Sequence, residues 1–253
     1  MTILTPAHPT STRAARVVSV ARLNVANPWS ALILPWIFLI GILLLNIGIW
    51  ALITAAAGPV DYGSSQFQWS GSVFFIYIYM LIAAMQIIGV TFPFALGYGV
   101  TRRNFFLGSS VTFVGVSLMY AIGMTVLALI ERATQGWGLG GHMFTAVYFG
   151  TTDPWYAQLW VFFCGLLLAF FGGSVFAAVW VRWKAIGIIA SLLVLSVLLL
   201  GVGAIAVYTE TEKDVAQAVI DLGPVGIASW SLVLSAASGL LGYLLLRRAT
   251  PRG

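Results

Sequence analysis

Six long apolar stretches follow one another along the chain, separated by shorter polar segments. None of the six contains Asp, Lys or Arg. Each exceeds the roughly 20 residues that a helix needs to cross a hydrocarbon core about 30 Å thick. The pattern predicts an all-α fold, a polytopic membrane protein in which residues 1–253 form a single transmembrane domain. The six membrane-spanning helices are predicted over 30–57, 72–96, 107–130, 156–181, 185–208 and 225–246.

The composition agrees with this pattern. Hydrophobic residues make up 60% of the chain and charged residues 8%, and the mean hydropathy is +1.00, which leaves too little polar surface for a soluble domain. The chain is basic, with a pI of about 9.6. Its Lys and Arg residues lie in short segments beside the apolar stretches, so we expect a lipid bilayer as the partner and no nucleic acid.

The charges are sorted by sign between the two sides of the expected membrane. If the N-terminus, 97–106, 182–184 and the C-terminus share one side, that side holds ten of the 12 basic residues and no acidic residue. The other side holds all 7 acidic residues and two basic ones. Because Lys and Arg are retained in cytoplasmic loops, both termini are predicted to be cytoplasmic, in a multi-pass protein of the cell (plasma) membrane.

The N-terminal residues 12–27 are predicted to form an interfacial helix on the cytoplasmic membrane surface. Apolar residues recur there at helical spacing while arginines occupy the rest of the circumference, and Asn27-Pro28 ends the helix. A disordered basic tail is the alternative, because the stripe is short and rich in alanine. We expect no cleaved secretory signal, since no apolar core precedes the proline. The stripe consists of Ala14, Val17, Val18, Ala21 and Val25.

A second short helix is predicted over 211–223, on the outer membrane surface. Thr211 to Asp214 have the spacing of a capping box, and apolar residues follow at helical spacing. The Gly223-Pro224 pair is typical of a helix end.

The sequence lacks the common catalytic motifs. It contains no phosphate-binding GxxxxGK[ST] loop, no GxSxG nucleophile elbow and no His or Cys pair with metal-ligand spacing. We therefore expect a chain that is not an enzyme and binds no metal or cofactor of its own. His8 and His142 have no partner nearby in sequence and are predicted to be solvated, whereas Cys164 is predicted to pack as a small hydrophobe.

Asn46 and Gln86 are the strongly polar residues within the apolar stretches. An interhelical hydrogen bond is the favoured interpretation for each, and contact with a transported substrate is the alternative. Because charged residues are absent from the stretches, a proton-driven or ion-driven carrier is disfavoured. Gly172-Gly173 in the fourth stretch is interpreted as a site of close helix packing, with a hinge as the alternative.

The most specific segment connects the second and third stretches. An apolar helix reaches Gly97 and Gly99, exposes a Thr-Arg-Arg-Asn sequence at 101–104 and re-enters the membrane through Phe105-Phe106. A basic loop with interfacial aromatic residues accounts for most of this pattern. The length and aromatic content are nevertheless enough for a short helix that projects below the membrane.

In this segment and in its topology, the chain resembles the permease subunits of ABC transporters, in the type-2 exporter group and its small bacterial members. The segment is similar to the family pattern Gly-x-[ST]-Arg-Arg-x-[FIL]-Phe. The resemblance implies that 97–107 is a coupling segment received by a groove of a separate cytoplasmic ATPase. The contact residues it implies are Gly99, Thr101, Arg102, Arg103, Asn104, Phe105 and Phe106.

The resemblance also implies partners and a function. The working unit would be two ATPase subunits, which bind ATP and Mg, and two permeases, the second being a copy or a paralogue. The permease contact would lie on 31–50 and 185–207, and the unit would export a lipophilic or amphipathic drug, antibiotic or peptide. An ATPase-independent channel or membrane sensor is the alternative, although no filter sequence or ring of like charges supports it. An intramembrane enzyme would need a nucleophile or metal cluster within the stretches.

Overall fold

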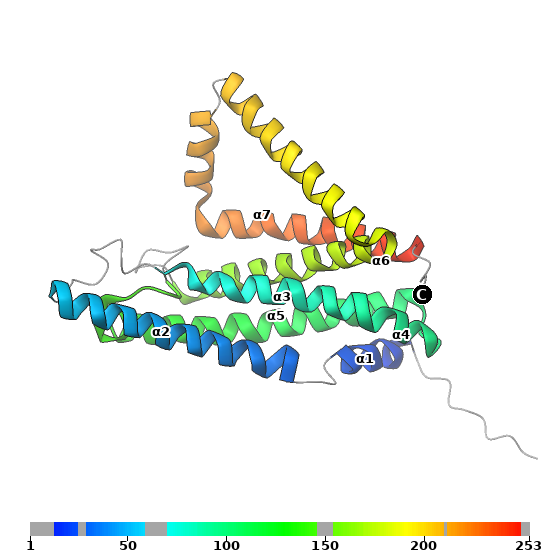
Figure 1. Cartoon of the computed structure of the whole chain (residues 1–253), viewed down its shortest axis with the longest axis horizontal. Coiled ribbons are helices and arrows are strands. Elements are labelled where there is room, and N and C mark those ends of the chain that lie inside the picture. The colour runs from blue at the N-terminus through cyan, green and yellow to red at the C-terminus, as the bar shows by residue number, and fades with distance from the viewer. Residues whose placement is uncertain (1–12, 25–28, 59–69, 146–153, 210–211, 249–253) are drawn as a thin grey trace, which may run out of the picture.

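The computed structural model describes residues 13–24, 29–58, 70–145, 154–209 and 212–248, and within them the chain is all-helical (Figure 1). The predicted all-α class is therefore confirmed for these residues. Among these described residues, five helices are long and apolar enough to cross a membrane, where six spans were predicted, so the chain is a membrane protein. The five helices are Leu34–Ala56, Gly71–Gly97, Arg102–Ala133, Trp155–Ile205 and Gln217–Arg247.

The elements follow a simple order, with short π or 3₁₀ segments at several junctions. In chain order they are α1 (Arg13–Asn24), η1 (Trp29–Ile33), α2 (Leu34–Ala57), η3 (Gly71–Val73), α3 (Phe74–Gln86), η4 (Ile87–Thr91), α4 (Phe92–Gly97), α5 (Arg102–Ala133), η5 (Gly136–Gly140), α6 (Trp155–Tyr208) and α7 (Glu212–Arg248).

Helix α1 packs against α5 at one end of the bundle (Figure 1). Its buried face carries Val20 and Asn24, which are 3% and 9% exposed, whereas Val18 is 47% exposed. A Cβ on Gly108 of α5 would lie 2.6 Å from the Val20 side chain, so this glycine permits the close approach. The prediction of a helix is confirmed for the described residues. The face that packs on α5 is centred on Val20, and Val18 of the predicted apolar stripe lies outside this contact.

Two indole rings of α2 pack against α5 and against the residue that follows η5. Trp36 lies over Gly123 and stacks on Tyr120, with ring centroids 5.0 Å apart. Trp50 covers Gly141 in the same way, and it is only 3% exposed. At each of these glycines a larger residue would collide with the indole ring. Gly123 and Gly141 therefore set how closely α2 approaches the bundle.

The segments α3 and η4 pack on α6, where a row of buried residues faces a row of small ones. The small residues on α6 recur every fourth position, so they share one face of the helix. At Gly173 an added Cβ would overlap the Leu81 carbonyl oxygen, which confirms the interpretation of this glycine as a site of close packing. The two rows are Ile76, Met80, Ala84 and Ile88 on one side and Gly165, Ala169, Gly173 and Ala177 on the other.

Helix α6 has 54 residues, about 80 Å at 1.5 Å per residue and more than twice the thickness of a hydrocarbon core. It is broken at Lys184, whose φ of 56° lies in the left-handed region that residues other than glycine rarely adopt. The chain turns back at this point (Figure 1). The break separates the two stretches that were predicted as the fourth and fifth spans. Residues 185–208 then lead away from the bundle and are exposed on almost every side.

Helix α7 is broken at Gly223, with φ 60° and ψ 179°, and Pro224 follows. Residues 212–222 run across the long axis of the bundle, and the rest of α7 runs along α6 (Figure 1). The boundaries of the predicted short helix therefore agree with the structure, except that residue 211 lies outside the described residues. Gly239 of α7 lies at the contact with α6, where an added Cβ would be 3.1 Å from the Phe171 ring.

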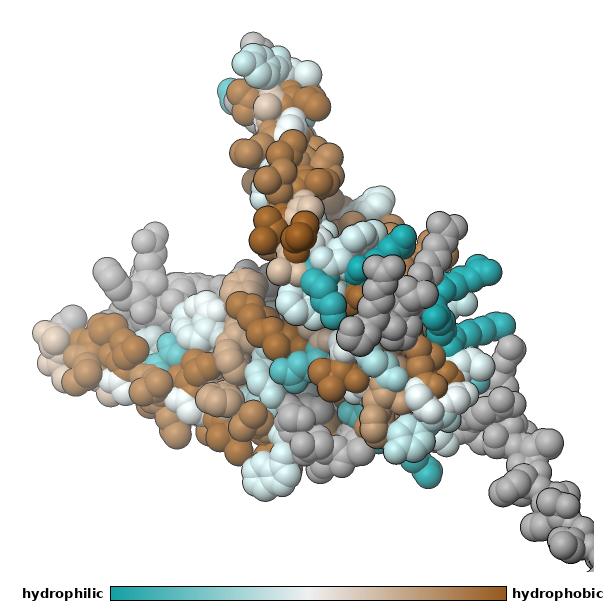
Figure 2. Space-filling model, turned by 45° about the vertical axis from the view of Figure 1, so that its right-hand side comes forward, coloured by the Kyte–Doolittle hydropathy of each residue, from teal (hydrophilic) through white to brown (hydrophobic). Residues whose placement is uncertain are grey.

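Polar and apolar surfaces are separated along the bundle. Apolar side chains cover the sides of the bundle and the helix that leaves it, while hydrophilic residues gather at one end (Figure 2). That end holds α1, the α4–α5 connection, the break in α6 and the end of α7 (Figure 1). The basic segments that were grouped from the sequence are thus neighbours in space where they are described.

Candidate functional site

The connection between α4 and α5 is a tight turn, and α5 begins directly after it. Gly99 has φ +78°, a conformation that favours glycine, and the Val100 N–H donates to the Ala95 carbonyl at 3.1 Å. The Thr101 hydroxyl accepts from the Asn104 N–H at 3.3 Å and so caps α5. The expectation of a separate short helix is therefore wrong: this described segment is the turn and the first turn of α5.

The predicted coupling segment is accessible only in part. Tyr98 is 76% exposed, and Gly99, Thr101 and Arg103 are also exposed. The residues buried in the bundle are Asn104, Phe105 and Phe106. Because a buried side chain cannot contact a separate subunit, the surface that this segment offers a partner is formed by 98–103.

Two phenylalanines anchor the turn to the bundle. The Phe105 ring lies against Phe92 of α4, with centroids 5.3 Å apart. The Phe106 ring lies against Tyr243 of α7, with centroids 5.4 Å apart. The turn is thus attached on two sides, so a force on it acts on α4 and α7 together.

Arg102 adds a polar connection between the turn and α7. Its Nη1 donates to the carbonyls of Leu246 at 3.2 Å and Arg247 at 2.8 Å. These carbonyls belong to the last turn of α7, where the helix dipole favours a cation and where intrahelical partners are missing. Arg102 is therefore committed to positioning the turn, whereas Arg103 remains exposed.

A hollow of about 250 Å³ lies between this turn and α1. Its size suits one inserted side chain and not a whole helix, which is about 10 Å across with its side chains. The exposed Arg103 and the exposed Arg22 of α1 bring positive charge to this end of the bundle. The hollow is lined by Ser19, Val20, Tyr98, Gly99, Val100, Thr101 and Asn104.

The two polar residues predicted within the spans differ in their surroundings. Asn46 donates to the Ile42 carbonyl at 2.8 Å and to the Ser72 hydroxyl at 3.0 Å. The predicted interhelical hydrogen bond is therefore confirmed for Asn46, which joins α2 to η3. Gln86 is exposed on α3 and makes no hydrogen bond to the described part of the chain, so the same prediction is wrong there. Its position faces away from the helices that could offer a partner.

The opposite end of α5 carries a buried carboxylate, Glu131, which directly follows the third apolar stretch. Glu131 is 0% exposed. Its Oε2 accepts from the N–H groups of Met143 and Phe144, both at 3.0 Å, and from the Trp137 indole at 3.3 Å. Its Oε1 accepts from the Thr145 N–H at 3.0 Å and from the Thr145 hydroxyl.

These five hydrogen bonds explain why a charged residue can be buried here. A buried carboxylate is tolerated only when its oxygens are satisfied, and here the donors come from the segment that follows α5. Glu131 therefore holds 136–145 against the end of the bundle. The one hint in the sequence was its position, since a lone Glu directly after an apolar stretch is followed by a glycine-rich loop.

His142 belongs to the same buried cluster. It is 0% exposed, and its Nδ1 lies 2.9 Å from the Thr145 hydroxyl oxygen, which also bonds to Glu131. The prediction of a solvated His142 is wrong. The loop folds back onto Glu131, and this buries the imidazole. His8 lies outside the described residues. Cys164 is fully buried, as predicted for a packed small hydrophobe.

Burial lowers the pKa of the His142 imidazole, and the nearby Glu131 carboxylate opposes this shift. Such a histidine binds a proton more readily in the unfolded chain than in the fold. The free energy of unfolding should therefore fall as the pH drops below about 6.5, the ordinary pKa of histidine. We expect His142→Gln to weaken this dependence in thermal unfolding between about pH 8 and about pH 5.5. Equal pH slopes for the two proteins would contradict the assignment.

The described residues thus form two candidate sites at opposite ends of the bundle. One is an exposed turn, tied to α4 and α7, beside a hollow and positive charge. The other is a loop fastened by a buried carboxylate. Neither a family model, nor a curated protein, nor a solved structure matches this chain.

Proposed function

We propose that the chain is the membrane-spanning permease subunit of an ATP-driven ABC exporter of the small type-2 kind. The observation that carries the proposal is the α4–α5 turn: Tyr98 to Arg103 protrude from the end of the bundle where the basic segments gather, next to a hollow of side-chain size. A turn fixed to two spans and exposed at its tip is suited to transmit movement from a soluble partner.

In this proposal the end with the turn is cytoplasmic, as are both termini. The two halves of α6 cross the plasma membrane separately, which makes six crossings, and α1 lies at the cytoplasmic interface. Glu131 and residues 212–222 are then on the outer side. The distribution of basic and acidic residues supports this orientation.

A second permease, a copy or a paralogue, would cover part of 185–208. This half of α6 is apolar and leaves the bundle without packing on the rest of the described chain along most of its length. Lipid alone can cover an apolar helix, but helix packing adds contacts where small residues permit it. Gly201 and Gly203 have open space around them and suit such an approach.

The chain itself would bind no nucleotide. Two ATPase subunits would bind ATP and Mg and receive the turn. The apolar helices offer a substrate Leu, Val, Phe and Trp side chains with few polar groups. A lipophilic or amphipathic substrate therefore fits them better than a charged solute, which would lose its hydration without compensation. Glu131 does not change this inference, because all its described partners are internal.

Reversal of one charge tests the proposed contact. Arg103→Glu should weaken the apparent affinity of the ATPase for the permease about tenfold, since loss of an interfacial ion pair together with like-charge repulsion costs about 1.4 kcal/mol. The measurement is permease-stimulated ATP hydrolysis in proteoliposomes, titrated with the ATPase that is encoded beside or purified with this chain. Phe106 is unsuitable for this test because its removal would disturb the packing against α7.

Lys184→Glu is the matched control, because Lys184 is also basic and exposed, and it lies at the break in α6, at the same end of the bundle. It should leave the stimulation unchanged. Equal stimulation by wild type and Arg103→Glu would remove the coupling role from this turn. Substrate efflux that continues with an ATPase lacking its phosphate-loop lysine would favour a channel or a secondary carrier instead.

A further inference from the structure

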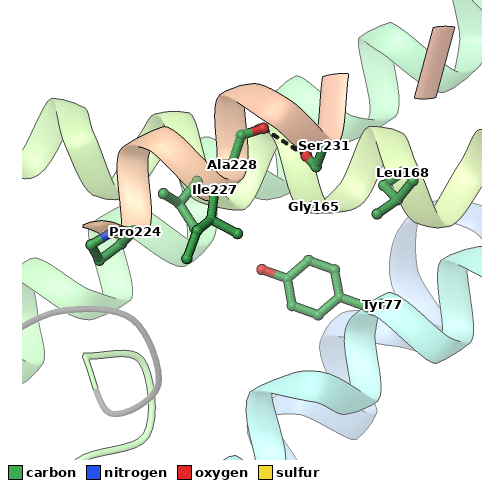
Figure 3. Close-up of a pocket in the computed structure, with 8 residues that line it drawn as sticks. Tyr77, Gly165, Leu168, Pro224, Ile227, Ala228 and Ser231 are labelled. Carbon is green, nitrogen blue, oxygen red and sulfur yellow. Dashed lines mark hydrogen bonds between the residues drawn. The ribbon is translucent and has the colours of Figure 1, made fainter. Parts of the chain in front are cut away.

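The hollow between α1 and the α4–α5 turn has a polar wall, in contrast to the groove that runs between α3 and α7. The groove reaches Gly172 of α6, and its lining is apolar apart from the hydroxyls of Tyr77 and Ser231 (Figure 3). The hollow is lined on one side by Thr101 and Asn104, at the start of α5. Polar groups that converge on a cavity indicate a polar ligand, so the hollow is the better candidate for a specific binding site.

Asn104 presents an unused side-chain amide to the hollow. Only 6% of its surface is exposed. Its backbone N–H donates to the Thr101 hydroxyl, but the side-chain amide makes no hydrogen bond to the described part of the chain. Both polar atoms of the amide are nevertheless accessible, as expected where they face the cavity that the residue lines. A buried amide without a partner costs free energy, which a ligand in the hollow would recover.

The position of this amide at the start of α5 selects an anionic ligand. The helix begins at Arg102 and has 32 residues, and the first N–H groups of a helix lack intrahelical acceptors and carry partial positive charge. Exposed arginines at this end of the bundle, Arg22 and Arg103, add full positive charges. No acidic residue lines the hollow. A cation would therefore meet repulsion here, whereas a phosphate or a carboxylate would be attracted.

The surroundings favour the phosphate of a lipid over a soluble anion. The turn connects the candidate spans Gly71–Gly97 and Arg102–Ala133, so the hollow lies at the level where hydrocarbon gives way to headgroups. The Phe94 and Tyr98 rings, whose centroids are 4.8 Å apart, are both exposed, and Tyr98 lines the hollow. Aromatic rings are common at the membrane interface and offer an apolar surface to an acyl chain. A soluble anion would leave that surface unused.

We propose that the hollow binds the phosphate of one phospholipid. Its volume of about 250 Å³ exceeds the roughly 150 Å³ that the five heavy atoms of a phosphate need at about 30 Å³ each. The phosphate accepts hydrogen bonds from the Asn104 amide and the Thr101 hydroxyl, while the acyl chains pass over Tyr98 and Phe94. The exposed tip of the turn stays available to a soluble partner, so the site does not depend on the proposed transport function.

Lipid titration of the full chain in a non-ionic detergent, followed by native mass spectrometry, tests the site without any ATPase present. The probes are phosphatidylglycerol and a diacylglycerol with the same acyl chains, which differ only in the phosphate headgroup. We expect one phosphatidylglycerol to bind about tenfold more tightly than the diacylglycerol, the gain expected from charge-assisted hydrogen bonds. Inorganic phosphate at the same concentration should not displace it, because it lacks the acyl chains. Equal affinity for the two lipids, or displacement by inorganic phosphate, would overturn the proposal.

One isosteric substitution places the lipid in the hollow. Asn104→Asp should weaken phosphatidylglycerol binding about tenfold, because it removes a donor and sets a negative charge against the phosphate. Asp in the first turn of α5 also interacts favourably with the helix dipole, so the fold should be retained. Gln217→Glu is the matched control, the same change of amide to carboxylate at an exposed position before the break in α7, and it should leave lipid binding unchanged.

The same variant separates a lipid from a partner subunit as the occupant. If Asn104→Asp binds phosphatidylglycerol as tightly as wild type but loses stimulation of the ATPase, the hollow receives an acidic side chain of that subunit, and the lipid proposal fails. If Asn104→Asp loses the lipid, the proposal stands whatever the result of the Arg103→Glu test. The wild-type comparison of the two lipids decides even if the variant does not fold.

Discussion

Replacement of Glu131 by alanine should lower the midpoint of thermal unfolding of the purified protein by about 10 °C. The change leaves three backbone N–H groups, the Trp137 indole and the Thr145 hydroxyl without their acceptor. Each buried unsatisfied group costs about 1–3 kcal/mol, and water entering the vacated space offsets part of the sum. A net loss of about 3 kcal/mol corresponds to this shift for a chain of this size.

Two variants make the result specific to the buried carboxylate. Glu131→Gln keeps the shape but points an NH₂ group toward donors, so we expect a loss nearly as large as with alanine. Asp221→Asn removes a charge at an exposed position, where the carboxylate accepts from Gln217 within the described part of the chain, and should change the midpoint little. If Glu131→Ala and Asp221→Asn unfold at the same temperature as wild type, Glu131 does not fasten the loop.

Gly173→Ala should be strongly destabilising although it adds only a methyl group. The added Cβ would overlap the Leu81 carbonyl oxygen and lie 3.0 Å from the Ala84 Cβ. A backbone carbonyl in a helix cannot move aside alone, so α3 must shift from α6 along the whole row of small residues. Overpacking of this kind costs about 1–3 kcal/mol, and we expect a fall of roughly 3–10 °C in the unfolding midpoint.

The neighbouring glycine provides a control of the same chemistry. Gly172→Ala adds its Cβ to open space, so the higher helix propensity of alanine should stabilise the protein by about 0.5–1 kcal/mol. The two substitutions are adjacent in sequence yet should act in opposite directions. Thermal unfolding in detergent measures both. Equal midpoints for the two variants would mean that α3 and α6 do not pack at the distance described.

The positions of the main helices were predictable from the sequence, because the length and polarity of each apolar stretch suffice to specify a helix in a membrane. The break at Lys184 and the break at Gly223 fall where basic residues or a Gly-Pro pair interrupt the apolar pattern. Local chemistry also explains why Thr101 caps α5. In each case the determining interactions lie within a few residues of one another.

Predictions about faces and burial were less successful, because they depend on neighbours far away in sequence. The apolar stripe of α1 was assigned to the membrane surface, and nothing local in the sequence indicated that α5 packs on the side of Val20, where Gly108 leaves room. Phe105 and Phe106 were expected to meet a partner subunit, and in this fold they pack on Phe92 and Tyr243. Whether the exposed remainder of that segment meets an ATPase stays a prediction.

The sequence by itself determined that the chain is an all-helical membrane protein, where its apolar helices run and how its charges are distributed between the loops. Hydrophobicity and charge are properties of the residues alone, and the bilayer responds to them segment by segment. Only the tertiary structure decided that Glu131 and His142 are buried, that Arg102 binds the end of α7 and that a groove opens over Gly172. Each of these depends on which distant side chain or carbonyl occupies the adjacent space, and no local pattern carries that information.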